Sequence, residues 1–140
     1  MGSRTSADTP LRVVIADDDA FARRVIKLAL RARGMTVVAE AKDGREAVRS
    51  TLIHQPDLVV LDVVMPGLDG ILATREILDA DPDLRVVVLT GAGEDALGIQ
   101  ALRAGAIAVV PDDANVDALA RAVEGAGRGE WAIARITQVG

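Results

Sequence analysis

Five short runs of consecutive apolar residues divide the chain, and each run has the length of a β-strand. Three of them are rich in β-branched residues and two are weaker; in chain order the runs cover residues 11–16, 36–41, 57–62, 84–90 and 106–110. The apolar residues are continuous rather than alternating, which predicts strands that are covered on both faces, as in a parallel sheet.

The segments between these runs have the spacing of amphipathic helices, each with one apolar stripe toward the sheet. The first stripe is predicted to consist of Phe21, Val25, Leu28, Ala29 and Ala32. The last is predicted to consist of Val116, Leu119, Ala120 and Val123. Start and stop signals agree with this assignment, because Asp43 followed by Glu46 is typical of a helix start, while Gly34 and Gly105 are typical of helix ends.

Alternating strands and helices predict five β-α units, and right-handed crossovers make a doubly wound α/β sandwich the simplest arrangement. We expect this domain to span residues 11–127, after a disordered N-terminal segment at 1–10. Residues 128–140 are predicted to be a linker or docking tail. That segment follows a glycine-rich stretch and carries Trp131, Ile133 and Ile136 with no strand or helix partner.

Composition narrows the class of protein. The chain has 140 residues, half of them apolar, which suits one domain with a sizeable aliphatic core. A formal charge of −5 argues against direct nucleic-acid binding, which requires clustered lysine and arginine. No apolar run approaches the roughly 20 residues that span a bilayer, and cysteine is absent. We therefore expect a cytoplasmic protein with no membrane partner.

Ligands of open α/β sheets bind just beyond the carboxyl ends of the strands. Polar side chains stand at these ends in four of the five predicted strands, at Asp17, Asp18, Asp62, Thr90 and Asp112. Neighbouring strand ends lie only about 5 Å apart, so these side chains can meet in one pocket. Clustered carboxylates repel each other without a cation, and all-oxygen ligands suit Mg²⁺. For Asp19, helix capping is the favoured interpretation.

Asp62 differs from the other acids because it precedes a turn at Pro66 and Gly67, with Asp69 able to begin the next helix. A carboxylate held beside a metal can attack phosphorus and form an aspartyl phosphate. Thr90 would offer its hydroxyl to the phosphoryl oxygens. Gly91 would leave the approach open and present a backbone N–H to the anion.

Four stretches resemble the receiver domains of two-component response regulators: VVIADDDAFARR, PDLVVLDVVMPGLDG, VVVLTGAG and ALRAGAIAVV. The resemblance covers roughly residues 11–127, and the spacings from Asp18 to Asp62 and from Asp62 to Thr90 are usual for that family. Two further stretches, EAKDGREAV and GEWAIARIT, look most like the LuxR-type (NarL/FixJ) subclass, whose receivers precede a helix-turn-helix DNA-binding domain. The residues after 127 are too few for such an output domain.

The resemblance implies a flavodoxin-like fold with strand order 2-1-3-4-5 and Asp62 as the phosphoacceptor. Mg²⁺ or Mn²⁺, weakly held, would bind Asp17, Asp18, Asp62 and the carbonyl of Val64, and Thr90 would be the switch hydroxyl. A sensor histidine kinase and a second copy are the implied partners, the latter through the fourth helix, fifth strand and fifth helix. No enzymatic activity is expected beyond phosphorylation and dephosphorylation of Asp62 itself.

Two positions depart from the family pattern. Asp112 stands where the family has a lysine, and Val109 stands where it has an aromatic switch residue. A carboxylate about 6 Å from Asp62 would repel a phosphoryl group there by roughly 3 kcal/mol at an effective dielectric near 20. Without the aromatic residue, the coupling from Asp62 to the fourth helix should be weak or altered.

Three functional hypotheses follow. The first is an atypical receiver that acts mainly by dimerisation or partner contacts, with impaired phosphorylation at Asp62. The second is a conventional receiver that a histidine kinase phosphorylates on Asp62 with Mg²⁺. A third, remote hypothesis is a haloacid-dehalogenase-like phosphohydrolase. That family requires an Asp-x-Asp nucleophile motif, whereas Val63 and Val64 follow Asp62.

Overall fold

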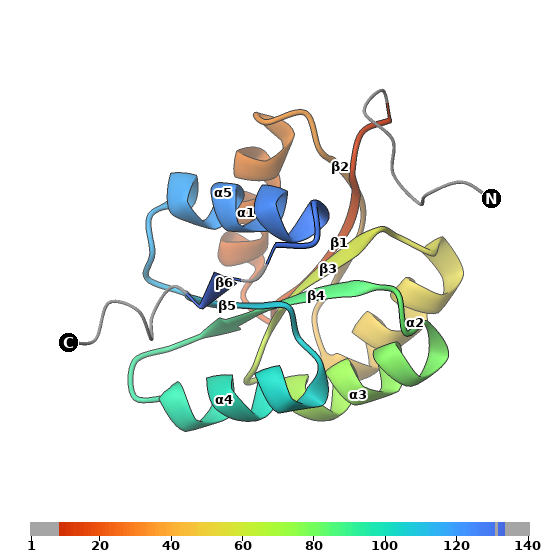
Figure 1. Cartoon of the computed structure of the whole chain (residues 1–140), viewed down its shortest axis with the longest axis vertical. Helices are drawn as coiled ribbons and strands as arrows, with labels where there is room; N and C mark the ends of the chain where they lie inside the picture. The colour runs from red at the N-terminus through yellow and green to blue at the C-terminus, as the bar shows by residue number, and fades with distance from the viewer. Residues whose placement is uncertain (1–8, 131, 134–140) are drawn as a thin grey trace.

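The computed structural model describes residues 9–130 and 132–133, which form a parallel sheet between two layers of helices (Figure 1). The strands are β1 Arg12–Ala16, β2 Thr36–Ala41, β3 Leu58–Asp62, β4 Arg85–Thr90, β5 Ala108–Pro111 and β6 Ala132–Ile133. The helices are α1 Ala20–Arg31, α2 Gly44–His54, α3 Gly70–Ala80, α4 Asp95–Ala104 and α5 Val116–Gly127.

The sheet has the order β2-β1-β3-β4-β5-β6, and every neighbouring pair is parallel. The predicted doubly wound, flavodoxin-like fold with strand order 2-1-3-4-5 is therefore confirmed. Strand β6 is a sixth strand, which the sequence analysis did not predict. Residues after 127 were predicted to have no strand partner, and this is wrong for Ile133, which pairs with Val109 of β5.

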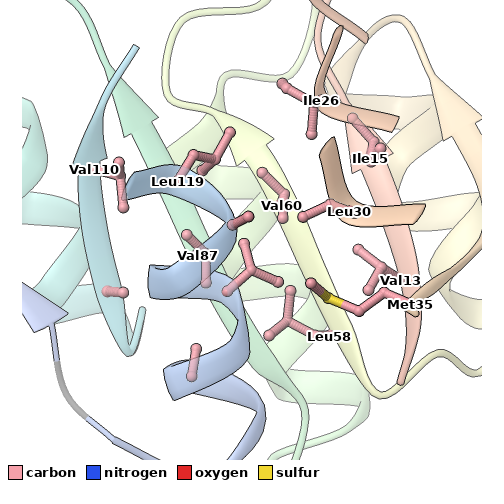
Figure 2. Close-up of a cluster of buried hydrophobic side chains, with 14 of the residues drawn as sticks. Val13, Ile15, Ile26, Leu30, Met35, Leu58, Val60, Val87, Val110 and Leu119 are labelled. Carbon is pink, nitrogen blue, oxygen red and sulfur yellow. The ribbon is translucent and has the colours of Figure 1, made fainter. Parts of the chain in front are cut away.

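Helices α1 and α5 cover one face of the sheet, and α2, α3 and α4 cover the other (Figure 1). Each face has its own aliphatic core. Figure 2 shows the core under α1 and α5, where Ile26, Leu30 and Leu119 lie over Ile15 and Val60 of the sheet. Because both faces are covered, β1, β3, β4 and β5 consist mainly of consecutive buried residues, as their continuous apolar runs predicted. The same prediction is wrong for the edge strand β2, of which only Ala41 is buried.

The predicted stripe of α1 is wrong. Side chains of Phe21 and Leu28 are 73% and 57% exposed, whereas Ile26 and Leu30 face the sheet. Helix α1 has apolar residues around much of its circumference, so a set with helical spacing could be chosen on more than one face. For α5 the prediction holds for three of its four residues; only Val116 is largely exposed.

Helix ends follow the predicted signals. The side chain of Asp43 accepts a hydrogen bond from the N–H of Glu46 at 2.8 Å, and the side chain of Asp69 accepts one from Leu72 at 2.9 Å. Gly105 ends α4 with a φ of 116°, a left-handed conformation that suits glycine. These caps fix where the connections begin, and the connections after β1, β3, β4 and β5 form the candidate site.

Two of the predicted features lie outside the described residues. These are residues 1–8 of the N-terminal segment and, in the tail, Trp131 and Ile136. In the described part of the chain, no helix has the length and apolarity needed to cross a bilayer.

Candidate metal and phosphoacceptor site

Three carboxylates meet where β1 and β3 end. Asp17 and Asp18 directly follow β1, and Asp62 is the last residue of β3, the strand paired with β1. One oxygen from each of the three side chains lies within 4.8 Å of the other two. Asp17 is 5% exposed, Asp62 is half-buried and Asp18 is exposed, so the group opens to solvent on one side. We refer to Asp17, Asp18 and Asp62 as the metal half of the site.

Local hydrogen bonds hold Asp17 in place. Its Oδ1 accepts the N–H of Asp19 at 2.9 Å, and its own N–H donates to the carbonyl of Ala41 at 3.0 Å. The carbonyl of Asp17 accepts a bond from Nη1 of Arg23 at 2.6 Å. Asp19 is used differently, because its Oδ1 caps α1 by accepting the N–H of Phe21 at 2.9 Å. The capping interpretation of Asp19 is confirmed.

Close backbone packing fixes the connection that carries Asp62. A Cβ atom on Gly44 would lie 1.8 Å from the carbonyl oxygen of Leu68, and one on Gly70 would lie 2.4 Å from the carbonyl oxygen of Asp62. No side chain fits at either position. The start of α2 and the start of α3 therefore clamp the β3–α3 connection, and the N–H of Val64 bonds to Oδ1 of Asp62 at 3.1 Å.

Burial raises the pKa of Asp62 to about 7, and the N–H of Val64 opposes this shift. The negative charges of Asp17, Asp112 and Glu94 raise it further. Burial also raises the pKa of Asp17. The negative charge of Asp17 and Asp62 is disfavoured in this way. The three converging carboxylates fit a hard divalent cation, which stabilises the charged forms and binds oxygen ligands.

The connections after β4 and β5 form the other side of the site, which we call the phosphoryl half: Thr90, Gly91, Glu94 and Asp112. Thr90 is 1% exposed, and among the described residues its Oγ1 has no hydrogen-bond partner. A buried hydroxyl without a partner is unfavourable. It is a suitable donor for an oxygen anion that enters the site.

Carboxylates line this half. The N–H of Gly91 donates to Oε1 of Glu94, so the donor that the sequence analysis assigned to an anion already has an anionic partner. A Cβ on Gly91 would lie 3.1 Å from Oε1 of Glu94 and 3.2 Å from Oδ2 of Asp112. The sequence analysis did not identify Glu94 as a site residue. The available signal for it was an acidic residue three positions after Gly91, in the loop next to the proposed phosphoryl position.

Asp112 follows β5, its N–H donates to the carbonyl of Thr90 at 2.7 Å, and its side chain is exposed. Its charge raises the pKa of Asp62, but burial and Asp17 raise it more. Solvent screens an exposed charge. The repulsion is therefore smaller than the roughly 3 kcal/mol obtained from sequence for an unscreened pair.

Val109 is buried beneath α4. A Cβ on Gly98 of α4 would lie 3.1 Å from Cγ1 of Val109 and 3.5 Å from Cγ2 of Thr90. Helix α4 therefore packs closely over both side chains. The side chain of Val64 is half exposed, and metal coordination by its carbonyl stays a prediction.

Residues 13–124 match the family model described as the response regulator receiver domain. The chain belongs to this family. The fold, the acidic group and the resemblance found in the sequence are in agreement with that membership.

Similar proteins include receivers with different outputs. The chain is 43% identical over 95 residues to the chemotaxis protein CheY of Bacillus subtilis, covering 68% of this chain and 79% of CheY. It is 43% identical over 104 residues to protein-glutamate methylesterase/protein-glutamine glutaminase 5 of Myxococcus xanthus, covering 73% of this chain and 30% of that protein. This chain thus spans less than a third of the methylesterase.

Among solved structures, a two-component response regulator of the LuxR family from Aurantimonas sp. SI85-9A1 superposes with a TM-score of 0.85. It is 34% identical, and the match covers 93% of this chain and 94% of that one. Relatives with chemotaxis, methylesterase and LuxR-family names share the receiver. Membership of the LuxR-type subclass therefore stays a prediction.

Proposed function

We propose that this receiver domain binds Mg²⁺ or Mn²⁺ through its metal half and accepts a phosphoryl group at Asp62 only poorly. Signalling then depends mainly on contacts with a second copy or another partner. The observation that carries the proposal is that both side chains beside Gly91, those of Glu94 and Asp112, are carboxylates.

Metal binding is supported by the three oxygens of Asp17, Asp18 and Asp62. A bound divalent ion would lower the cost of charging Asp62 and draw phosphate oxygens toward the site. The carbonyl of Val64 is the further ligand that the family resemblance implies. Such a site would be occupied without phosphorylation of Asp62, since none of its ligands belongs to the phosphoryl half.

Phosphoryl transfer requires more than the metal. An oxygen of Asp62 would form a bond to phosphorus while the bond from phosphorus to the donor's leaving atom breaks, and the leaving group departs with that electron pair. The transferred oxygens then need donors. Thr90 can supply one, but Glu94 occupies the N–H of Gly91, and Asp112 adds negative charge where the family has a lysine.

A conventional receiver remains the second candidate. The observation that favours it is the buried, unpartnered hydroxyl of Thr90 beside a complete acidic group. If Glu94 turns away and the metal neutralises the carboxylates, Asp62 could be phosphorylated efficiently by a histidine kinase. The two candidates differ in one measurable quantity, which is the extent and rate of phosphorylation at Asp62.

Incubation with acetyl phosphate and Mg²⁺, followed by intact-mass measurement, tests this difference. We expect an adduct on only a small fraction of the protein, and Asp62→Asn should remove even that. A stoichiometric adduct that is lost in Asp62→Asn would contradict impaired phosphorylation and establish the conventional receiver. The CheY of Bacillus subtilis, incubated in parallel, serves as a reference for the donor and the metal.

Dimerisation is proposed through the face formed by α4, β5 and α5. Ile99 on α4 is 41% exposed, and Ala96, three residues earlier on the same helix, is also exposed. Sedimentation equilibrium should show a dimer without phosphodonor, and Ile99→Glu should make it monomeric. The matched change Ile53→Glu, at an exposed apolar position on α2, should leave the dimer intact. Equal effects of both substitutions would argue against this face.

In this proposal a sensor histidine kinase would be the phosphodonor, and a DNA-binding domain would be the output. If the LuxR-type subclass is correct, this receiver would regulate a helix-turn-helix DNA-binding domain in the same protein, with the dimer setting the distance between two DNA half-sites. The receiver itself would make no direct contact with nucleic acid, because its net charge is −5.

A further inference from the structure

The loop between β4 and α4 is closed by its own acidic residue. The N–H of Gly91 donates to Oε1 of Glu94, and the N–H of Glu94 donates to the carbonyl of Gly91 at 3.1 Å. The same two residues are therefore joined by two hydrogen bonds of opposite direction. One of these bonds uses a charged side chain, and it occupies a backbone donor of the phosphoryl half.

Helix α4 begins without a side-chain cap. In the part of the chain that the structure describes, each of the other four helices has its N-cap side chain bonded to an N–H of the first turn. The N-cap of α4 is Glu94, and its side chain makes no such bond. It reaches back to Gly91 instead. Because a carboxylate at a helix N-terminus is stabilising, α4 lacks a contact that its own N-cap residue carries the charge to make.

The loop has room for a second arrangement of Glu94. Ala92 and Gly93, which lie between the two bonded residues, are both exposed. Gly93 has a φ of 81°, and nothing lies within 4 Å of the place where its Cβ would be. Turning the side chain of Glu94 away from Gly91 would free the N–H of Gly91 and bring the carboxylate to the first turn of α4.

An oxygen anion that enters the phosphoryl half would compete with Glu94 for the N–H of Gly91. The hydroxyl of Thr90 is 1% exposed and unpartnered among the described residues, so it would be a second donor to that anion. Burial is the main cause that raises the pKa of Asp62, and the charge of Glu94 adds to it. Since two anions at one donor repel each other, the incoming anion favours release of Glu94.

Glu94 also belongs to α4 through its backbone. The N–H of Gly98 donates to the carbonyl of Glu94 at 3.0 Å. Gly98 in turn packs on the sheet, where a Cβ would lie 3.1 Å from Cγ1 of Val109 and 3.5 Å from Cγ2 of Thr90. A change at Glu94 therefore acts directly on the first turn of α4 and on the turn that covers the site.

We propose that Glu94 is a positioning residue that gates the phosphoryl half and couples its state to α4. Without an anion, the carboxylate occupies the N–H of Gly91. With an anion bound, it moves to the first turn of α4 and caps this helix, which gives the two discrete arrangements that a switch requires. The inference rests on the proposed function, because the anion is the phosphoryl group of Asp62. It supplies a coupling that needs no aromatic residue at the position of Val109.

The substitution Glu94→Asp tests the gate without any anion. It keeps the charge, but its side chain is one methylene too short to bond to Gly91, and aspartate is a preferred N-cap residue. We expect the amide NMR signals of Ala96 and Leu97, in the first turn of α4, to shift to the positions that the unmodified protein reaches only with beryllofluoride, a phosphoryl analogue, and saturating Mg²⁺. Signals that stay at the anion-free positions would overturn the proposal.

A second substitution, Glu94→Ala, separates binding from coupling. It should bind beryllofluoride at least about tenfold more tightly than the unmodified protein, the scale of one charge-assisted contact. The signals of Ala96 and Leu97 should then no longer respond to the anion. Asp95→Asn removes a charge one residue along the chain and is the matched control. It should change the affinity less than about twofold, because an exposed charge is screened, and it should keep the response of α4.

Folding of each variant is checked by the amide signals of β2, which two strands separate from β4. Equal gains in affinity in Glu94→Ala and Asp95→Asn would mean that net charge and not a gate controls entry, and absence of beryllofluoride binding in Glu94→Ala would also overturn the gate. Intact-mass measurement with acetyl phosphate is a separate test. Efficient phosphorylation of the unmodified protein would contradict impaired phosphorylation, whereas the gate would still be established by the altered response of α4 in the two Glu94 variants.

Discussion

The metal half and the phosphoryl half of the acidic edge are built differently. The metal half is clamped by backbone, since the carbonyl oxygens of Leu68 and Asp62 lie where side chains on Gly44 and Gly70 would project. The phosphoryl half is bordered by side chains that can turn, and the neighbours of Gly91 are the carboxylates of Glu94 and Asp112. One half presents three carboxylates in a rigid frame, and the other presents carboxylates on side chains that can turn.

The difference predicts that metal binding and phosphoryl acceptance are separable in this receiver. In our proposal the domain keeps the geometry needed for a divalent ion but lacks the positive charge that favours the phosphoryl group. Substitutions that act on only one half can therefore test whether the two are independent.

The largest expected effect concerns the metal half. Asp18→Asn should lower Mg²⁺ affinity about 100-fold, because one of three charged ligands is lost. Asp19→Asn removes the same charge one residue away but keeps a helix cap, so it should change the affinity less than about twofold. Isothermal titration calorimetry measures both. Equal losses would mean that the net charge of the acidic run, and not coordination, sets the affinity.

The next largest effect concerns the difference in rigidity between the two halves of the site. Gly44→Ala should lower the free energy of unfolding by about 2 kcal/mol, since its Cβ would displace the carbonyl of Leu68. Gly91→Ala meets only the ends of flexible side chains and should cost less than about 1 kcal/mol. Urea denaturation at constant pH gives both values. A larger loss of unfolding free energy in Gly91→Ala than in Gly44→Ala would contradict the contrast between a clamped half and an adaptable half.

A pH dependence of about 1 kcal/mol is expected without metal, after allowance for the partial exposure of Asp62. Its pKa of about 7 means that the folded protein holds a proton that the unfolded chain releases from about pH 4 upward. The free energy of unfolding should therefore fall as pH rises from about 4 to 7 and then level off. Asp17 acts in the same direction.

Two comparisons check this assignment by thermal unfolding. Asp62→Asn should flatten the pH profile, and Mg²⁺ should raise the melting temperature more above pH 7 than at pH 5, because it stabilises the ionised carboxylates. A profile that stays as steep in Asp62→Asn would exclude Asp62 as its source.

The smallest expected effect concerns two buried threonines. Thr90→Val should be neutral or stabilising by up to about 1 kcal/mol, because its hydroxyl has no partner in the described structure. Thr74→Val should instead cost about 1 kcal/mol, since Oγ1 of Thr74 donates to the carbonyl of Gly70 at 2.7 Å. Denaturation of the two variants compares them directly. A clear destabilisation by Thr90→Val would mean that its hydroxyl has a partner in solution.

Sequence was sufficient for the fold and for the metal half. Continuous apolar runs marked the buried strands, and the strand order that the family resemblance implies brings the residues after β1 and β3 together. Capping by Asp19, Asp43 and Asp69 was also readable, because the cap is a local interaction between residues close in the chain.

Other features depended on tertiary packing and could not be read from spacing. The buried face of α1 was misassigned because Phe21 and Leu28 have the same helical spacing as residues that face the sheet. The bond from Gly91 to Glu94 depends on the path of a loop. Pairing of β6 with β5 follows a glycine-rich turn whose direction the sequence does not encode by periodicity.

The most direct test of the central claim compares phosphorylation rates of the unmodified protein, Asp112→Asn and Asp112→Lys with acetyl phosphate and saturating Mg²⁺. Removing the carboxylate should speed formation of the adduct on Asp62, and introducing an ammonium should speed it by at least about tenfold, with Mg²⁺ affinity changed far less. Rates that are the same in all three proteins would contradict the claim that charge in the phosphoryl half limits phosphorylation.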